Sequence, residues 1–301
     1  MADKLEVTRV WAYRHDRAVD SVSLAGLSGE TIISDRRERI VFIDASGSVL
    51  WDKKTDFSPL AVRLTDTADA AYILTLAGHL LRVTRDAELE WDLWVDRQPL
   101  TLEIKAKGQA AAVICRRGRI HIVNMRGKRI RLLHAPESVA HARISPGGAL
   151  FVASAQGWLG RYDRSFSPNG EMRLGRDVFG VEVSERGRKI VLPGKDDGLG
   201  VISLDDSSMT AYNPGFSVIK AGMDEKGEKI AAVGLEGDIA VLNIEGETLW
   251  RSKTDHSWVQ CEMSRAGDRF VVVSDKGFAA CYGVGQGRPD RAGGHFDYLE
   301  I

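Results

Sequence analysis

A period of about forty residues runs through this chain of 301 residues and constrains its fold more than any other feature. A glycine that follows an apolar run recurs with spacings of 39 to 41 residues, at Gly78, Gly118, Gly157, Gly198, Gly237 and Gly277. A second glycine, in a polar turn, keeps the same period at Gly108, Gly148, Gly187, Gly227 and Gly267. A fixed period on this scale indicates a repeat architecture, in which neighbouring units bury a continuous core that no single unit could bury alone. The repeated unit, rather than the whole chain, therefore decides the fold.

Each unit consists of short apolar runs separated by glycine turns, as in the segments KIAAVGLEGDIAVLNIEGETLW and RFVVVSDKGFAACYG. Short runs of apolar or β-branched residues between such turns are typical of β-strands. The turn glycines suit tight hairpin loops, which need a positive φ that glycine adopts without a Cβ clash. A unit of this length holds four strands and leaves no room for a helix, which is the pattern of a β-propeller blade.

The positions of the first strand and of a recurring tryptophan give the number of blades and the way the ring closes. Seven first strands are expected, beginning near Val19, Leu60, Leu100, Val139, Phe179, Val218 and Val259. A tryptophan that fills space between neighbouring blades is expected on the fourth, outermost strand, at Trp11, Trp51, Trp91 and Trp250. Trp11 precedes every first strand, whereas the seventh unit has only three strands of its own. We therefore expect residues 5–14 to complete the last blade and remove an open sheet edge.

These observations predict an all-β chain with one domain over residues 1–283, followed by a flexible tail over residues 284–301. The domain is a single seven-bladed β-propeller of four-stranded antiparallel blades, closed by its N-terminal strand. The segments VFIDASGSVLW and AVLNIEGETLW resemble the repeat of PQQ-like propellers, and ISPGGALFVASAQGWLGRYD is similar to a WD40-like blade. The resemblance covers about residues 5–283 and implies the propeller fold, which hosts many unrelated activities.

Composition and local motifs favour a non-catalytic, cytoplasmic protein with no cofactor and no metal. The formal net charge is −1, and no apolar run reaches the length of a signal peptide core or a membrane helix, so no membrane insertion is expected. The three cysteines are isolated from one another, as is typical of reduced thiols in the cytoplasm. None of the seven histidines belongs to a local metal-binding motif, and the glycine-rich segment GVGQGRPDRAGG lacks the lysine of a phosphate loop.

Three tryptophans outside the repeated position are candidates for contact with a partner protein. Trp94 and Trp258 are expected in loops that join fourth to first strands, and Trp158 follows the turn between strands two and three. These two classes of loop open on the same face of a propeller. Tryptophan is favoured at interfaces because it buries a large, rigid surface. The alternative is that one or more of these side chains cap the ends of blades.

The third unit is locally basic in a chain that is nearly neutral. Between residues 97 and 134 there are ten lysines or arginines and one acidic residue, Glu103. The candidate contact residues are Arg116, Arg117 and Arg119 at one turn and Arg126, Lys128 and Arg129 at another. Such a sector could meet an acidic protein or a phosphate backbone. It could equally be a charged blade edge that resists strand pairing.

The tail ends in GGHFDYLEI, in which Phe296, Tyr298 and Leu299 could grip the propeller itself or a partner. Taken together, the sequence predicts a protein-interaction scaffold or accessory subunit that binds one or more proteins of a complex. One alternative is an enzyme or small-ligand protein that uses the central channel. Another is a nucleic-acid-associated scaffold that uses the basic third blade.

Overall fold

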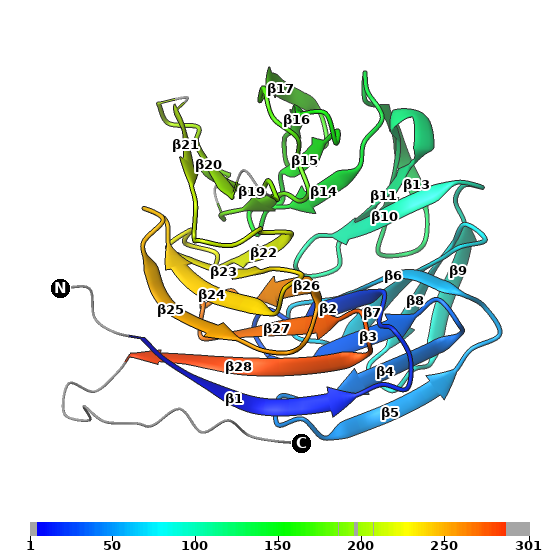
Figure 1. Cartoon of the computed structure of the whole chain (residues 1–301). Coiled ribbons are helices and arrows are strands. Elements are labelled where there is room, and N and C mark those ends of the chain that lie inside the picture. The colour runs from blue at the N-terminus through cyan, green and yellow to red at the C-terminus, as the bar shows by residue number, and fades with distance from the viewer. Residues whose placement is uncertain (1–4, 186, 196–197, 207, 287–301) are drawn as a thin grey trace.

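Seven four-stranded antiparallel sheets stand in a ring around a central channel (Figure 1). This computed structural model describes residues 5–185, 187–195, 198–206 and 208–286. The prediction of a seven-bladed β-propeller is confirmed. Within the described ranges the helical content is a single 3-10 turn, η1 (Arg116–Gly118).

Six blades are built from four consecutive strands each, written here from the channel outward. Blade 1 is β2 (Ser21–Leu24), β3 (Thr31–Asp35), β4 (Arg39–Ile43) and β5 (Val49–Lys54). Blade 2 is β6 (Pro59–Leu64), β7 (Ala70–Thr75), β8 (His79–Thr84) and β9 (Leu89–Trp94). Blade 3 is β10 (Pro99–Ile104), β11 (Ala110–Cys115), β12 (Arg119–Asn124) and β13 (Arg129–His134).

The second half of the ring repeats the arrangement. Blade 4 is β14 (His141–Ile144), β15 (Leu150–Ala153), β16 (Trp158–Tyr162) and β17 (Pro168–Arg173). Blade 5 is β18 (Glu182–Val183), β19 (Lys189–Pro193), β20 (Leu199–Ser203) and β21 (Ser208–Tyr212). Blade 6 is β22 (Lys220–Met223), β23 (Lys229–Val233), β24 (Asp238–Asn243) and β25 (Thr248–Lys253). Blade 7 is β26 (Trp258–Met263), β27 (Arg269–Ser274), β28 (Phe278–Gln286) and β1 (Leu5–Arg14).

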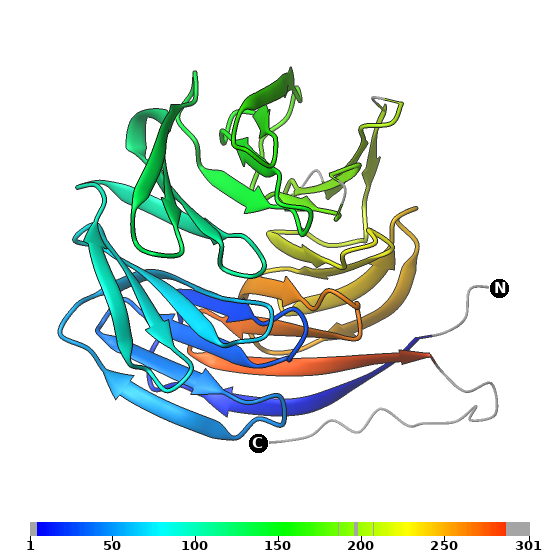
Figure 2. The ribbon, with the colours of Figure 1, turned by 180° about the vertical axis from the view of Figure 1, so that it is seen from behind.

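The two ends of the chain meet in blade 7, where β1 lies beside β28 (Figures 1 and 2). The antiparallel pairing runs from Leu5 opposite Gln286 to Arg14 opposite Phe278, with a bulge between Arg9 and Trp11. Closure by the N-terminal strand is therefore confirmed. The last strand continues to residue 286, three residues beyond the boundary expected at 283, because β1 is long enough to pair with it.

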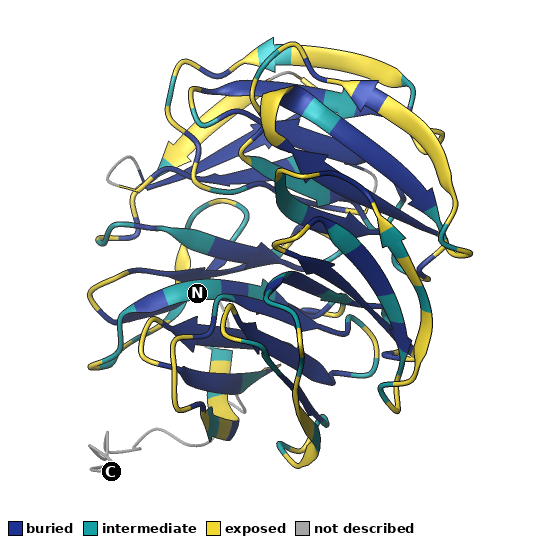
Figure 3. Ribbon diagram, turned by 90° about the vertical axis from the view of Figure 1, so that its right-hand side faces the viewer, coloured by how far each residue is buried: buried dark blue, intermediate teal, exposed yellow. Residues whose placement is uncertain are grey.

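Burial is greatest in the second and third strands of the blades and lowest in the outermost strands (Figure 3). Every residue of β3 is buried, whereas the outermost strand of the same blade, β5, is exposed apart from Trp51. The apolar clusters join neighbouring blades: one contains Tyr72 and Leu80 of blade 2 together with Leu102 and Val113 of blade 3. Stability thus comes from blade-to-blade packing, as expected for a repeat that cannot bury its own faces.

The recurring tryptophan is a blade-to-blade clamp. Trp51 Nε1 donates to Arg85 O at 2.8 Å, and Trp91 Nε1 donates to Met125 O at 2.9 Å. Each acceptor lies 34 residues later, in the outer turn of the next blade. Arg131, one period after Trp91, makes the same kind of bond through its guanidinium.

Arg131 Nη1 donates to Ser165 O at 3.0 Å, again 34 residues on. The turns between third and fourth strands carry glycines where the tryptophan of the neighbouring blade packs against them. A Cβ built on Gly127 would lie 2.8 Å from the Trp91 ring, and one on Gly47 would lie 2.4 Å from Trp11 Cβ. Both contacts are shorter than a carbon atom tolerates, so the glycines let neighbouring blades come together.

Candidate functional site

The alternation of strands places the loops on two opposite faces. Loops between fourth and first strands, and between second and third strands, lie on one face, here called the upper face. Loops between first and second strands, and between third and fourth strands, lie on the opposite, lower face. On the lower face the inner loops bond to one another around the channel, for example from Asp66 N to Ala106 O at 2.8 Å and from Glu225 N to Arg265 O at 3.0 Å.

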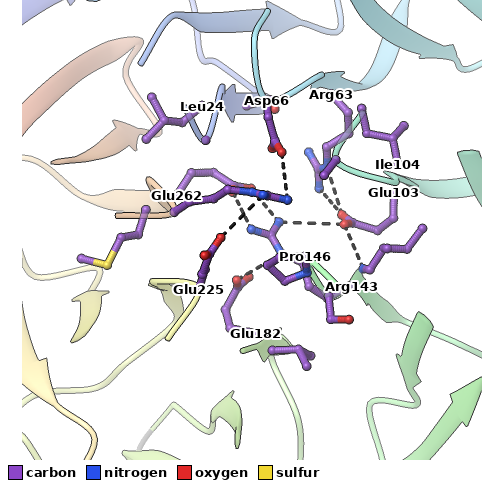
Figure 4. A pocket seen from close by; sticks show the side chains of 18 of the residues that line it. Leu24, Arg63, Asp66, Glu103, Ile104, Arg143, Pro146, Glu182, Glu225 and Glu262 are labelled. Carbon is purple, nitrogen blue, oxygen red and sulfur yellow. Dashed lines mark hydrogen bonds and ion pairs between the residues drawn. The ribbon is translucent and has the colours of Figure 1, made fainter. Parts of the chain in front are cut away.

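A ring of charged side chains crosses the central channel (Figure 4). It comes from one position of the repeat on the seven innermost strands. The occupants, spaced 39 or 40 residues apart, are Ser23, Arg63, Glu103, Arg143, Glu182, Gly222 and Glu262. Arginine and glutamate alternate through the middle of this series. We call the five charged members the channel ring.

The channel ring is held together by ion pairs from several blades. Arg63 donates to Glu103 Oε1 from Nε at 2.9 Å and from Nη2 at 2.8 Å. The Arg143 Nε lies 3.2 Å from Glu182 Oε2 in the adjacent blade. Its Nη2 donates to Glu262 Oε2 at 3.0 Å, although blade 4 and blade 7 are not neighbours. The Arg143 guanidinium therefore spans the channel.

The ring contains two guanidiniums and three carboxyls, and the burial of the groups decides how this imbalance is resolved. Burial raises the pKa of Glu182 to about 8, outweighing the opposing attraction of Arg143. Burial also opposes ionisation of Glu262, but Arg143 and Arg63 outweigh it and lower the pKa of that carboxyl. At neutral pH the ring thus holds two paired charges of each sign and one protonated carboxyl.

The channel ring separates two hollows of different size. The lower one, of about 100 Å³, is lined by Asp66, Glu225 and Arg265 among others. Arg265 Nη2 lies 2.8 Å from Asp66 Oδ2, and Nη1 lies 3.5 Å from Glu225 Oε2. Burial raises the pKa of Asp66 to about 6 despite this pairing. The lower hollow is small, and its one guanidinium is already paired with both carboxyls.

The hollow on the upper side is larger, about 280 Å³, and we call it the upper cavity. Its wall carries Thr101, His141, Lys220 and Gln260, which come from four different innermost strands. Burial lowers the pKa of Lys220, and it lowers the pKa of His141 to about 4. Polar groups from four blades thus converge on one concave, partly closed space.

Of the three tryptophans expected at a partner surface, one is exposed. Trp94 ends β9 and keeps 49% of its surface exposed, whereas Trp158 and Trp258 keep 4% and 0%. Trp258 starts β26 instead of lying in a loop, and it packs against both His256 and Phe278. Trp158 Nε1 donates to Glu171 Oε2 at 3.1 Å. The two buried side chains cap blades and offer no surface to a partner.

The basic residues of blade 3 are divided between the two faces. Arg116 and Arg117 lie in the upper-face turn η1, whereas Arg126 and Lys128 lie in the lower-face turn between β12 and β13. A strand of six residues, about 20 Å long, separates the turns. The remaining two are engaged with the propeller itself: Arg119 Nη2 donates to Asp96 Oδ1, and Arg129 Nη2 donates to Val95 O.

Trp94 and the upper-face arginines belong to one area, which we call the rim patch: Leu76, Trp94, Arg116 and Arg117. Val95 N donates to Gly78 O at 2.8 Å, which holds the Leu76 loop beside the end of β9. Arg116 N donates to Gln98 O at 3.0 Å, which holds η1 against the segment that follows Trp94. Leu76 is 45% exposed. The predicted tail residues Phe296, Tyr298 and Leu299 lie outside the described residues.

A buried trio of Asp96, Cys115 and His121 brings three potential metal ligands within 4.8 Å of one another. Both carboxylate oxygens are engaged, one by Arg119 and the other by His121 Nε2 at 3.1 Å. Burial raises the pKa of the Cys115 thiol to about 12, so the thiolate that binds metals is disfavoured. Asp96, Arg119 and His121 are better described as a hydrogen-bonded network that ties the end of blade 2 to blade 3.

Comparison with known proteins does not narrow the identity of the chain. No family model matches it, and no curated protein matches it. The described part of the chain contains no helix that is long and apolar enough to cross a membrane.

The search for local motifs did not find the channel ring, although the regular spacing of its residues can be seen in the sequence. Arg63, Glu103 and Arg143 are spaced by 40 residues, in step with the glycines.

Proposed function

We propose that this protein is a non-catalytic interaction module of the WD40-like or PQQ-like propeller type, acting in the cytoplasm as a subunit of a multiprotein complex. The observation that carries the proposal is the exposure of Trp94 in the rim patch. A tryptophan with half of its surface in water is unfavourable unless another surface covers it. Trp94 shares the rim patch with exposed Leu76 and two exposed arginines, and tryptophan and arginine are enriched at interface hot spots.

The chemistry of the rim patch favours an acidic partner with an apolar anchor. Arg116 and Arg117 supply two positive charges on the upper face, and Trp94 and Leu76 supply a rigid apolar platform. The backbone of Arg117 has φ 59°, a strained conformation for a side chain with a Cβ. Arg117 is exposed, so its guanidinium can meet a carboxylate of a partner.

An enzyme that uses the central channel and a nucleic-acid-associated scaffold receive less support from the described residues. The charged side chains of the channel ring form ion pairs with one another. Side chains in such pairs more often stabilise a fold than take part in catalysis. The division of the basic residues between two faces also interrupts a continuous phosphate track, which nucleic-acid binding requires.

The test is co-purification from the native host with a double variant, Trp94→Ser with Arg117→Glu. We expect a stoichiometric partner to copurify with the unaltered chain and to be lost from this variant. The matched control is Met125→Ser with Arg126→Glu, an exposed apolar and basic pair in the lower-face turn of blade 3. It should retain the partner. Equal retention by both variants, or no stoichiometric partner at all, would refute the assignment.

A further inference from the structure

The upper cavity is larger than the lower hollow, and it lies directly above the channel ring. Arg63, Arg143 and Glu182 contribute to its floor. A volume of about 280 Å³ corresponds to roughly nine water molecules at about 30 Å³ each. The space therefore has the size that a small polar metabolite could fill.

The hydrogen-bonding groups on its wall have capacity to spare. Lys220 Nζ donates one bond, to Phe179 O at 2.9 Å, and an ammonium carries three N–H groups. His141 Nε2 bonds to Val178 O at 3.0 Å, so this nitrogen must carry the hydrogen. Because His141 is neutral above its pKa of about 4, its Nδ1 is an acceptor. The wall thus offers an ammonium donor and an imidazole acceptor together.

The charge around the upper cavity is not balanced at neutral pH. The floor and wall contain three cations, Arg63, Arg143 and Lys220, and three carboxyls, Glu103, Glu182 and Glu262. Burial keeps Glu182 protonated up to a pKa of about 8. At the rim, Arg36 and Asp20 form an ion pair in which Arg36 Nε lies 3.2 Å from Asp20 Oδ1, so their charges cancel. With Lys220 in its ammonium form, one positive charge is left over, in a partly closed space where it is poorly solvated.

We propose that the upper cavity binds one small monoanionic hydroxycarboxylate. Its carboxylate would accept hydrogen bonds from the Lys220 ammonium and from the Gln260 amide, which lines the same wall. Its hydroxyl group would donate to His141 Nδ1, a contact that a carboxylate without a hydroxyl group cannot make. The ligand would supply the charge that the cavity lacks. This site is separate from the rim patch, so its existence does not depend on the proposed partner.

Binding should be coupled to protonation of Glu182. That carboxyl faces Arg143 on β14, Lys220 on β22, Glu262 on β26, Glu103 on β10 and Arg63 on β6. A bound anion adds negative charge near these groups and favours the protonated form of Glu182. Affinity should therefore fall as pH rises through about 8, with proton uptake on binding in that range.

Isothermal titration of the full chain with three probes of one carbon skeleton tests the proposal. The probes are glycerate, its neutral amide glyceramide, and the cationic aminopropanediol, with inorganic phosphate as a fourth titrant. We expect glycerate to bind roughly tenfold or more tightly than the other three. We also expect the apparent heat near pH 8 to depend on the ionisation enthalpy of the buffer. Equal binding of the three analogues, phosphate binding as tight as glycerate, or no binding of glycerate would overturn the proposal.

The variant Lys220→Met removes the ammonium and keeps the length of the side chain. It should weaken glycerate binding by roughly tenfold or more. The matched control is Lys229→Met, on the neighbouring strand β23, whose Nζ also donates to a backbone carbonyl, Gly267 O at 3.2 Å. Lys229 does not line the upper cavity, so glycerate binding should be unchanged. If both variants bind glycerate as the unaltered chain does, the site is wrong; if Lys220→Met fails to fold, the probe series still decides.

Discussion

Replacing Trp11 by alanine tests whether the N-terminal strand holds the ring closed. Trp11 is 6% exposed and packs in a cluster with Val22 and Val41 of blade 1 and Val271 of blade 7. A buried aromatic side chain covers about 150–250 Å², which at about 25 cal/mol per Å² is worth roughly 4–6 kcal/mol. The denatured chain already buries part of that area, so we expect Trp11→Ala to lower the free energy of unfolding by about 3–5 kcal/mol.

The measurement is urea unfolding followed by far-UV circular dichroism, with the free energy extrapolated to water. Trp94→Ala is the matched control, because the same side chain there is 49% exposed and should cost less than about 1 kcal/mol. Trp11→Phe adds a finer test. Trp11 Nε1 is buried without a hydrogen-bond partner, whereas Trp51 Nε1 donates to Arg85 O. Trp11→Phe should therefore cost less than Trp51→Phe.

The two substitutions to alanine can refute the reasoning directly. If Trp11→Ala changes the free energy of unfolding by less than about 0.5 kcal/mol, the strand that carries it contributes little to closure. If Trp94→Ala costs as much as Trp11→Ala, burial between blades is not what makes this position important.

Three further changes probe closure and the channel. Deleting residues 1–16 should lower the melting temperature and cause self-association, seen by calorimetry and light scattering, because the edge of β28 is exposed; an unchanged, monomeric protein would contradict this. Arg143→Met should cost about 3–5 kcal/mol in urea unfolding, because it strips Glu182 and Glu262 of their partner; a loss below about 1 kcal/mol would show that the ion pairs are dispensable. Glu182 holds a proton up to a pKa of about 8 in the folded chain, against 4.5 ordinarily, so its stabilising effect is full below about pH 4.5 and is lost as pH rises to about 8. Glu182→Gln should flatten that decline in a pH series of melting curves, and an identical slope in both proteins would count against the buried proton.

The fold was accessible from the sequence because its evidence is local and repeated. The strands and turns of each unit can be predicted from the residues of that unit alone. Because the same pattern occurs seven times, it is hard to reconcile with another architecture. The closing strand was accessible for the same reason. Trp11 occupies a known position of the repeat without the three strands that accompany it elsewhere, so its partners had to come from the other end of the chain.

The site was less accessible, because it depends on which elements meet. Trp94 and Trp258 both lie near the junction of fourth and first strands, yet one is half exposed and the other fully buried. The difference arises from the neighbours: His256 and Phe278 enclose Trp258. A sequence pattern locates a residue along its own strand but does not say what stands beside it.

By itself the sequence determined the number of blades, their order and the way the ring closes, because these follow from a period that is written along the chain. Only the tertiary structure decided the electrostatics of the channel. Arg143 and Glu262 are 119 residues apart in the sequence and lie in two blades that are not neighbours in the ring. They form an ion pair because the closed ring brings innermost strands from opposite sides of the channel together. Which charges are paired and which carboxyl keeps its proton depend on those distances across the axis, and such distances exist only once the ring has closed.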